Sequence, residues 1–211
     1  LFSVDGALFR FMRRLLDVLK LNFCWLICSI PLVTVGASTV AAYTVIFKIL
    51  DGTEGYVFKD FFKAFAQNWK QGTVLWLITA LAVYALYLDI QILSATEDPS
   101  IALIVVSILS FVAIFFALLY AFPLSAKYEN KFYMHIKNSF LLSFQYFGRT
   151  LLLLIVLAVE VAIGLWNWVT LIVVVIVGPA IFMFTVAGTA KKIFQENAKH
   201  NAERGIEESD S

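Results

Sequence analysis

The amino-acid sequence predicts an all-α, polytopic membrane helix bundle with about five to six transmembrane segments and three amphipathic interfacial helices. Hydrophobic residues make up 61% of the 211 residues and charged residues only 15%, a composition typical of membrane proteins rather than soluble domains. Because each crossing needs roughly 20 residues, the chain has room for five or six helices. Its 16 basic and 15 acidic residues nearly cancel, so nothing indicates nucleic acid as a partner.

The sequence divides into three units, each made of an interfacial amphipathic helix followed by a membrane hairpin. The units cover residues 1–50, 51–123 and 124–190, and together they form a single integral membrane domain. Residues 191–211 are polar, and we expect them to form a cytoplasmic tail.

The apolar run of the first unit, Leu21–Leu50, is interrupted in its middle by Pro31, Thr34, Gly36 and Ser38. Proline removes a backbone donor, glycine is conformationally free and serine can cap a new helix, so we predict two half-helices around Pro31–Ser38. Irregular backbone at membrane depth needs polar partners, which makes this stretch a candidate functional element. The alternative is a proline kink that only shapes the bundle.

Two topologies remain open for this run. A hairpin places all 16 Lys and Arg residues on one side of the membrane, as the positive-inside rule expects. A single crossing would strand the basic residues of the amphipathic segment Leu8–Lys20 on the outer side. Against the hairpin, each half of about 13 residues covers only about 20 Å of a roughly 30 Å core. Charge favours the hairpin, with both termini in the cytoplasm.

The second unit begins with an aromatic amphipathic segment that we expect to lie flat on the membrane. Its apolar face carries five candidates for docking a partner, with lysines on the opposite face. These candidates are Phe58, Phe61, Phe62, Phe65 and Trp69. Two predicted spans follow, Gly72–Ala95 and Ile101–Pro123, joined by a short acidic loop.

The third unit begins with an amphipathic segment, Tyr128–Phe147, in which aromatic side chains are expected to face lipid. On its other face, His135 and Ser139 are expected to face water. The last two spans form a hairpin that turns at Asn167.

Two acidic residues, Glu160 and Asp89, lie inside the predicted spans. A carboxylate at mid-bilayer costs several kcal/mol, so Glu160 is expected to face the bundle interior and meet a polar partner such as Asn167 or Asn22. Such a residue either contacts a substrate or ion, or makes a structural hydrogen bond. Asp89 lies about one turn from the outer boundary, where it can reach headgroup water.

The sequence shows no constellation of catalytic residues. Cys24 and Cys28 are spaced four apart on one apolar helix face, which is neither a redox pair nor a metal spacing. His135 and His200 lie in polar segments without nearby carboxylate or cysteine partners, and no metalloprotease, nucleophile-elbow or phosphate-binding motif occurs. We therefore predict no enzymatic activity, no metal and no cofactor.

The broken stretch and the segment after it resemble the YesL family of bacterial integral membrane proteins, a domain of unknown function found mainly in Gram-positive bacteria. The resemblance is specific over Asn22–Thr73. The residues that carry it include Asn22, Trp25, Pro31, Thr34, Gly36, Ser38, Ala41, Lys48, Gly55, Phe61, Phe62, Phe65, Asn68 and Gln71.

This resemblance implies no established catalytic residues, and genes that tend to lie beside carbohydrate ABC uptake systems and glycoside hydrolases. We therefore expect a multi-pass protein of the bacterial plasma membrane that contacts lipids and acts as an accessory subunit or assembly factor of a carbohydrate ABC importer. Docking on the importer's transmembrane subunits is expected to use Pro31–Ser38 and Phe58–Trp69. The alternative is a small solute or ion transporter or channel that uses the broken helix and Glu160.

Overall fold

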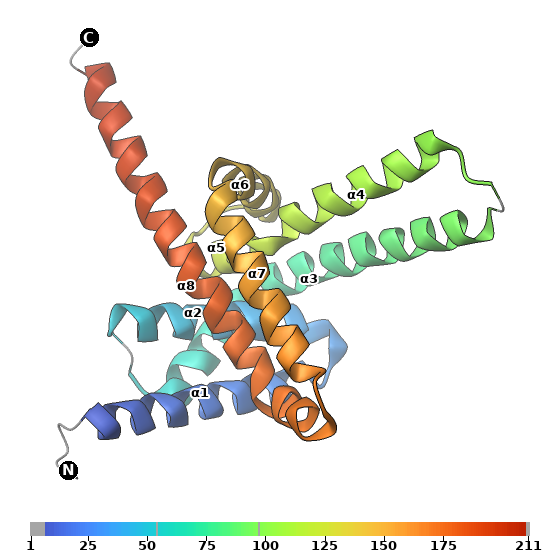
Figure 1. Cartoon of the computed structure of the whole chain (residues 1–211). Coiled ribbons are helices and arrows are strands. Elements are labelled where there is room, and N and C mark those ends of the chain that lie inside the picture. Colours follow the sequence, from blue (N-terminus) through green and yellow to red (C-terminus); the bar gives the residue numbers. More distant parts are fainter. Residues whose placement is uncertain (1–6, 54, 97, 210–211) are drawn as a thin grey trace.

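The computed structural model describes residues 7–53, 55–96 and 98–209, and every regular element in these ranges is helical. The elements in chain order are α1 (Ala7–Ser29), a short 3-10 helix (Leu32–Thr34), α2 (Val35–Asp51), α3 (Val57–Ala95), α4 (Ile101–Leu119), α5 (Ala121–Lys127), α6 (Phe132–Gln145), α7 (Phe147–Gly164) and α8 (Trp168–Ser209). Three hairpins, α1–α2, α3–α4 and α7–α8, turn on the side away from both termini (Figure 1). The predicted all-α class is confirmed.

The broken stretch is a helical hairpin in the structure. The chain runs out along α1, turns through Pro31 and the 3-10 helix, and returns along α2 to Asp51 (Figure 1). The predicted interfacial helix at the N-terminus is not a separate element, because α1 continues from Ala7 to Ser29 without a break. No proline or glycine separates its amphipathic and apolar parts, so the polarity changes while the helix continues.

α2 is the most deeply packed helix of the chain. Eleven of its 17 residues are buried, and α1, α3, α5 and α8 all pack on it. We call α2 and the parts of these helices that pack on it the hub. Small side chains such as Ala37, Ala41 and Ala42 allow neighbours to approach α2 closely, as in many membrane helix bundles.

α3 corrects the prediction of a flat helix followed by a separate span. It runs unbroken for 39 residues, about 58 Å at 1.5 Å per residue, which is longer than the roughly 30 Å hydrocarbon core. Its first half packs on the hub, whereas residues 77–95 project away with residues 101–115 of α4 (Figure 1). We call this projecting part of the α3–α4 hairpin the arm, and none of its residues is buried.

α6 also departs from the prediction, because its expected water-facing side is buried. Ser139 is fully buried, and its hydroxyl accepts a hydrogen bond from the Tyr120 amide at 2.9 Å and donates one to the Phe116 carbonyl at 3.0 Å. These bonds satisfy backbone groups where α4 gives way to α5. His135 is fully buried as well, so the polar face of α6 packs against protein rather than water.

The last hairpin turns at Asn167, as predicted. The Asn167 side-chain oxygen accepts a hydrogen bond from the Thr170 amide at 3.0 Å, which caps the start of α8. The predicted boundary after Ala190 is not a structural one, since α8 continues to Ser209. Ile193 and Phe194, in the expected polar tail, are buried in the core.

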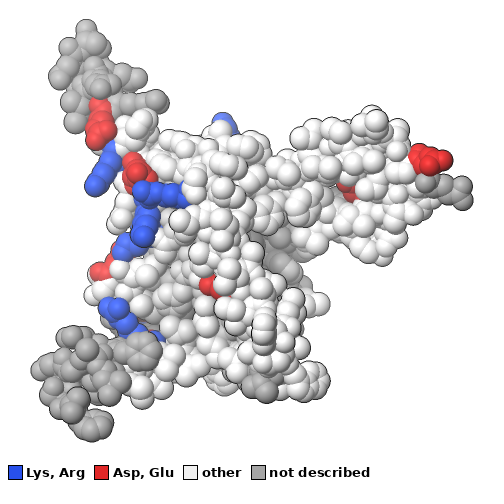
Figure 2. Space-filling view, in the orientation of Figure 1, with Lys and Arg blue, Asp and Glu red and all other residues white. Residues whose placement is uncertain are grey.

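The charges and the apolar helices are arranged as in a membrane protein. Lysine and arginine side chains gather along the edge that holds both termini, whereas an acidic side chain lies at the tip of the α3–α4 hairpin (Figure 2). Within the described residues, four helical stretches are long and apolar enough to cross a membrane. These stretches are Leu32–Asp51, Val57–Ala95, Ile101–Lys127 and Phe147–Gly164.

Candidate functional site

The turn of the broken stretch is held by Thr34. Its single hydroxyl hydrogen is shared between the carbonyl oxygens of Cys28 at 2.6 Å and Pro31 at 2.8 Å, and the Ile27 carbonyl, which Pro31 leaves without its helical donor, accepts from the Ile30 amide at 3.3 Å. Ser38 does not cap α2 as predicted, because the N-cap residue is Thr34. The Ser38 hydroxyl instead donates to the Thr34 carbonyl at 2.9 Å.

Gly36 marks a close crossing of α2 and α3. A Cβ atom on Gly36 would overlap the carbonyl oxygen of Gly72 and the Cβ atom of Trp76. In the same way, a Cβ atom on Gly72 would lie 2.7 Å from Cα of Ala37. Since Gly36 lies in this crossing and Ser38 is fully buried as well, neither can form part of a docking surface as predicted.

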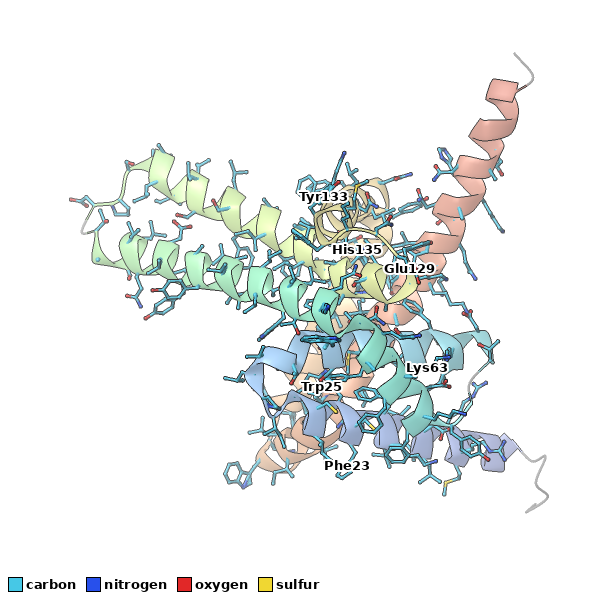
Figure 3. The ribbon with its side chains drawn as sticks, turned by 180° about the vertical axis from the view of Figure 1, so that it is seen from behind. Phe23, Trp25, Lys63, Glu129, Tyr133 and His135 are labelled. Atoms are coloured by element: carbon cyan, nitrogen blue, oxygen red, sulfur yellow. The ribbon has the colours of Figure 1, made fainter. Side chains whose placement is uncertain are left out.

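Asn22 joins α1 to α8, and Trp25 joins α1 to α2. Asn22 is 2% exposed, and its side-chain oxygen accepts a hydrogen bond from the Ala180 amide at 3.1 Å, next to the proline inside α8. Trp25 Nε1 donates to Thr39 Oγ1 at 3.1 Å across the α1–α2 hairpin. Trp25 therefore points inward from α1, while Phe23 lies on its outer side with 58% of its surface exposed (Figure 3).

The aromatic segment at the start of α3 has two faces. Phe61 is fully buried, so its predicted role as a docking residue is wrong, and Phe65 packs partly buried against the core. Phe58, Phe62 and Trp69 remain exposed by 46%, 52% and 52% of their surfaces. Adjacent phenylalanines point in different directions around a helix, and the apolar pattern alone does not say which one faces the core.

An ion pair anchors this segment to α2. Lys48 Nζ lies 2.7 Å from Asp60 Oδ1, and the Gly55 amide donates to Asp60 Oδ2 at 3.2 Å. The hydrogen bond from Lys48 holds the pKa of the Asp60 carboxyl below its usual value, since the ammonium and the amide both stabilise the charged form.

A polar cleft lies between α3 and the segment leading into α6. Its volume is about 720 Å³, and its walls include Gln67, Gln71 and Glu129. Glu129, Tyr133 and His135 group around the start of α6 (Figure 3). Gln71 Nε2 donates to the Asn130 carbonyl at 2.8 Å and lies 2.7 Å from His135 Nε2. Burial lowers the pKa of His135, which favours the neutral form of its imidazole.

A larger cavity of about 1130 Å³ lies between the arm and the α7–α8 hairpin. Trp25 and Tyr43 from the α1–α2 hairpin, Trp76 from α3 and Phe115 from α4 contribute to its walls. Glu160 of α7 lines it from the opposite side. The cavity is therefore apolar and aromatic, with an acidic group in one wall.

The two intramembrane acids have different partners. Thr185 Oγ1 of α8 donates to Glu160 Oε1 at 2.5 Å, a partner that the sequence did not reveal. The side-chain oxygens of Asn167 and Asn22, the partners expected for Glu160, accept hydrogen bonds from the amides of Thr170 and Ala180. In the arm, Ser107 of α4 donates to Asp89 Oδ1 at 3.0 Å. Asp89 thus links α3 to α4, whereas Glu160 faces a cavity.

The described residues contain no group of three His, Cys, Asp or Glu side chains that could hold a metal ion. Cys24 and Cys28, four residues apart in α1, are both free thiols. The predicted site residues are thus split into a packing group around α2, an exposed face at the start of α3, and two separate acids.

The long apolar helices define the chain as a multi-pass membrane protein. Residues 18–90 match the family described as "Protein of unknown function, DUF624". The chain is also 30% identical over 155 residues to the uncharacterized protein YesL of Bacillus subtilis (strain 168), which covers 72% of this chain and 73% of that relative. The chain therefore belongs to the YesL family. No solved structure is significantly similar to it.

Proposed function

We propose that the protein is a non-catalytic accessory subunit or assembly factor of a bacterial carbohydrate ABC uptake system, bound to the importer's transmembrane subunits. The observation that carries this proposal is the arm. Only 6% of the apolar window is buried in each of its two helices, against 56% in the helix that contains α2. An apolar hairpin with so few contacts inside its own chain offers a long lateral surface to another membrane protein.

The exposed face at the start of α3 supplies a second contact region. Phe58, Phe62 and Trp69 lie on it with exposed lysines, and aromatic anchors of this kind are enriched at the centres of protein interfaces. A standard interface buries about 1,200–2,000 Å² in total, so this face and the arm together suit a stable partner better than either alone. The carbohydrate importer is chosen because of the gene neighbourhood that the family resemblance implies.

The proposal includes an orientation in the plasma membrane. With both termini in the cytoplasm, α1 and α2 enter and leave as a hairpin and, together with α3, α4, α7 and α8, give six spanning segments. The gathering of lysine and arginine along the edge that holds both termini supports this orientation (Figure 2). In this arrangement the start of α3 lies on the cytoplasmic side, where it can dock on the importer's inner surface.

Co-purification from the native membrane tests the docking face. Phe62→Glu combined with Trp69→Glu should abolish recovery of the importer subunits, because two charged side chains would replace the aromatic anchors. The matched control is Tyr133→Glu, which adds a charge at a similarly exposed aromatic residue of α6. The proposal would be contradicted if the wild-type protein purified without any importer from cells that take up the importer's carbohydrate. Equal recovery of the importer subunits with the wild type and the double variant would contradict it as well.

A small solute or ion transporter is a second candidate, favoured by the position of Glu160 in a cavity wall. The broken helix adds little to it, since Gly36 and Ser38 are buried and Thr34 pairs the turn internally. Solute uptake by the purified protein in liposomes, lost in Glu160→Gln, would support the transporter over the accessory subunit.

A further inference from the structure

The cavity between the arm and α7–α8 has one acidic group and no basic group among the described residues that line it. Glu160 is half-buried there, and its Oε1 atom accepts a hydrogen bond from Thr185. A hydroxyl donor stabilises a carboxylate without neutralising it. In surroundings of low polarity, a carboxylate without a positive partner is costly, so the cavity favours an occupant that brings a positive charge.

Aromatic side chains make up much of the cavity wall. Trp25, Tyr43, Trp76 and Tyr87 reach it from three different helices, and phenylalanines of α4 and α8 add to them. Faces of aromatic rings attract cations, most strongly where water is excluded, and cages of such rings recognise quaternary ammonium groups. The cavity volume of about 1130 Å³ slightly exceeds the range of about 300–1,000 Å³ that is typical of ligand sites, so a large organic molecule fits.

We propose that this cavity is a binding site for lipophilic organic cations, with Glu160 as the counter-ion and the aromatic walls as the apolar contact surface. The ligand class is a molecule with a large apolar or aromatic body and a delocalised or quaternary positive charge. This proposal does not depend on the importer, since it rests only on the residues that line the cavity.

Charge distinguishes this occupant from the others that an apolar space could take. A neutral lipid chain or an apolar helix of a partner would fill the volume but leave Glu160 without a positive partner. Small inorganic cations need several oxygen ligands, and the wall offers them mainly hydrocarbon and aromatic rings. An organic cation satisfies both the acid and the apolar surface.

Two ions of the same shape and opposite charge test the proposal. Tetraphenylphosphonium and tetraphenylborate are titrated against the purified full-length protein in lipid nanodiscs, with empty nanodiscs as the blank. Binding is followed by calorimetry and by quenching of tryptophan fluorescence, since Trp25 and Trp76 line the cavity. The phosphonium should bind saturably, and at least about tenfold more tightly than the borate.

The variants assign the preference to Glu160. Glu160→Gln should weaken phosphonium binding by about tenfold or more and reduce the difference between the two ions, whereas Glu160→Asp should retain it. Asp89→Asn is the matched control, because this acid bonds to Ser107 in the arm and does not line the cavity. Its affinity for phosphonium should equal that of the wild type.

Three results would overturn the proposal. The first is equal affinity of the wild-type protein for both ions, which would show apolar partition alone. The second is unchanged phosphonium affinity in Glu160→Gln. The third is the absence of saturable binding to folded wild-type protein, including the case in which a tightly held phospholipid or partner helix fills the cavity. Should Glu160→Gln not fold, the comparison of the two ions on the wild-type protein still decides.

Discussion

The hub and the arm are both built from apolar sequence, but the chain buries them to very different extents. In the helix that contains α2, 56% of the apolar window is buried, whereas the figure is 6% in both helices of the arm. Apolar composition in this chain therefore does not mark the protein core. In the arm it reflects the surroundings that the helices meet, which are lipid or another membrane protein.

The two regions also handle their polar groups differently. In α2 the hydroxyls of Ser38, Thr39 and Thr44 donate to the carbonyl oxygens four residues earlier, at 2.8–2.9 Å. These side chains are satisfied within their own helix, so α2 can be surrounded by other helices without leaving unpaired groups. In the arm, the bond between Asp89 and Ser107 ties the two helices to each other instead.

The largest loss of stability is expected at Gly36 in the hub, where α2 and α3 leave no space for a side chain. Gly36→Leu would drive a side chain into the backbone of α3 at Gly72. Ordinary overpacking costs about 1–3 kcal/mol, and a clash with backbone costs more, so we expect loss of the folded protein. The comparison is Ala85→Leu in the arm, an exposed position where we expect a change within about 0.5 kcal/mol.

Thermal unfolding in detergent, followed by size-exclusion chromatography, measures both variants. Equal stability of Gly36→Leu and Ala85→Leu would mean that the hub is no more tightly packed than the arm.

The sequence predicted the elements of both regions better than the packing between them. Pro31 correctly indicated a break and Asn167 correctly marked the last turn, because such residues act on the local backbone. Gly36 lies inside α2 instead, where it allows the close approach of α3. The sequence did not predict that the flat and spanning segments form one helix, α3. Between Trp69 and Gly72 the chain changes polarity, but no residue there breaks a packed helix.

The sequence could not predict which polar side chains on different helices bond to each other, and the reason is different. Thr185 lies 25 residues from Glu160, and the relative rotation of α7 and α8 decides whether the two meet. Nor could the pattern show that Ser139 and His135 are buried, because a polar face of an amphipathic helix can pack on backbone carbonyls as well as face water. Such pairings depend on tertiary contacts rather than on spacing along the chain.

The second-largest loss of stability is expected on the buried face at the start of α3, and the exposed face serves as its comparison. Phe61→Ala should destabilise the protein by about 3–5 kcal/mol, because it empties a fully buried site beside α2. Phe62→Ala, the same change one residue further on at a half-exposed position, should cost no more than about 0.5 kcal/mol in detergent. Chemical unfolding in mixed micelles gives the two values. A similar cost for both would show that Phe62 also belongs to the hub.

The smallest change in stability is expected from the Lys48–Asp60 ion pair, which joins the first turns of α3 to α2. The folded-state pKa of Asp60 is lowered mainly by the hydrogen bond from Lys48, so its carboxylate stabilises the fold at pH values above the unfolded pKa of about 3.8. This stabilisation is lost as the pH falls from there through the folded pKa. Because Lys48 is 38% exposed, we expect less than about 1 kcal/mol.

Hydrogen exchange of the α3 amides at pH 6 and pH 3 measures this effect locally. At pH 3 the first turns of α3 should exchange faster relative to pH 6, after correction for the intrinsic rate, whereas the arm should change little. Asp60→Asn removes the titrating group, so its first turns should exchange at the same corrected rate at both pH values. An equal acid response in the wild type and in Asp60→Asn would assign the pH sensitivity to another group, and the contrast between the anchored start of α3 and its free arm would no longer depend on this ion pair.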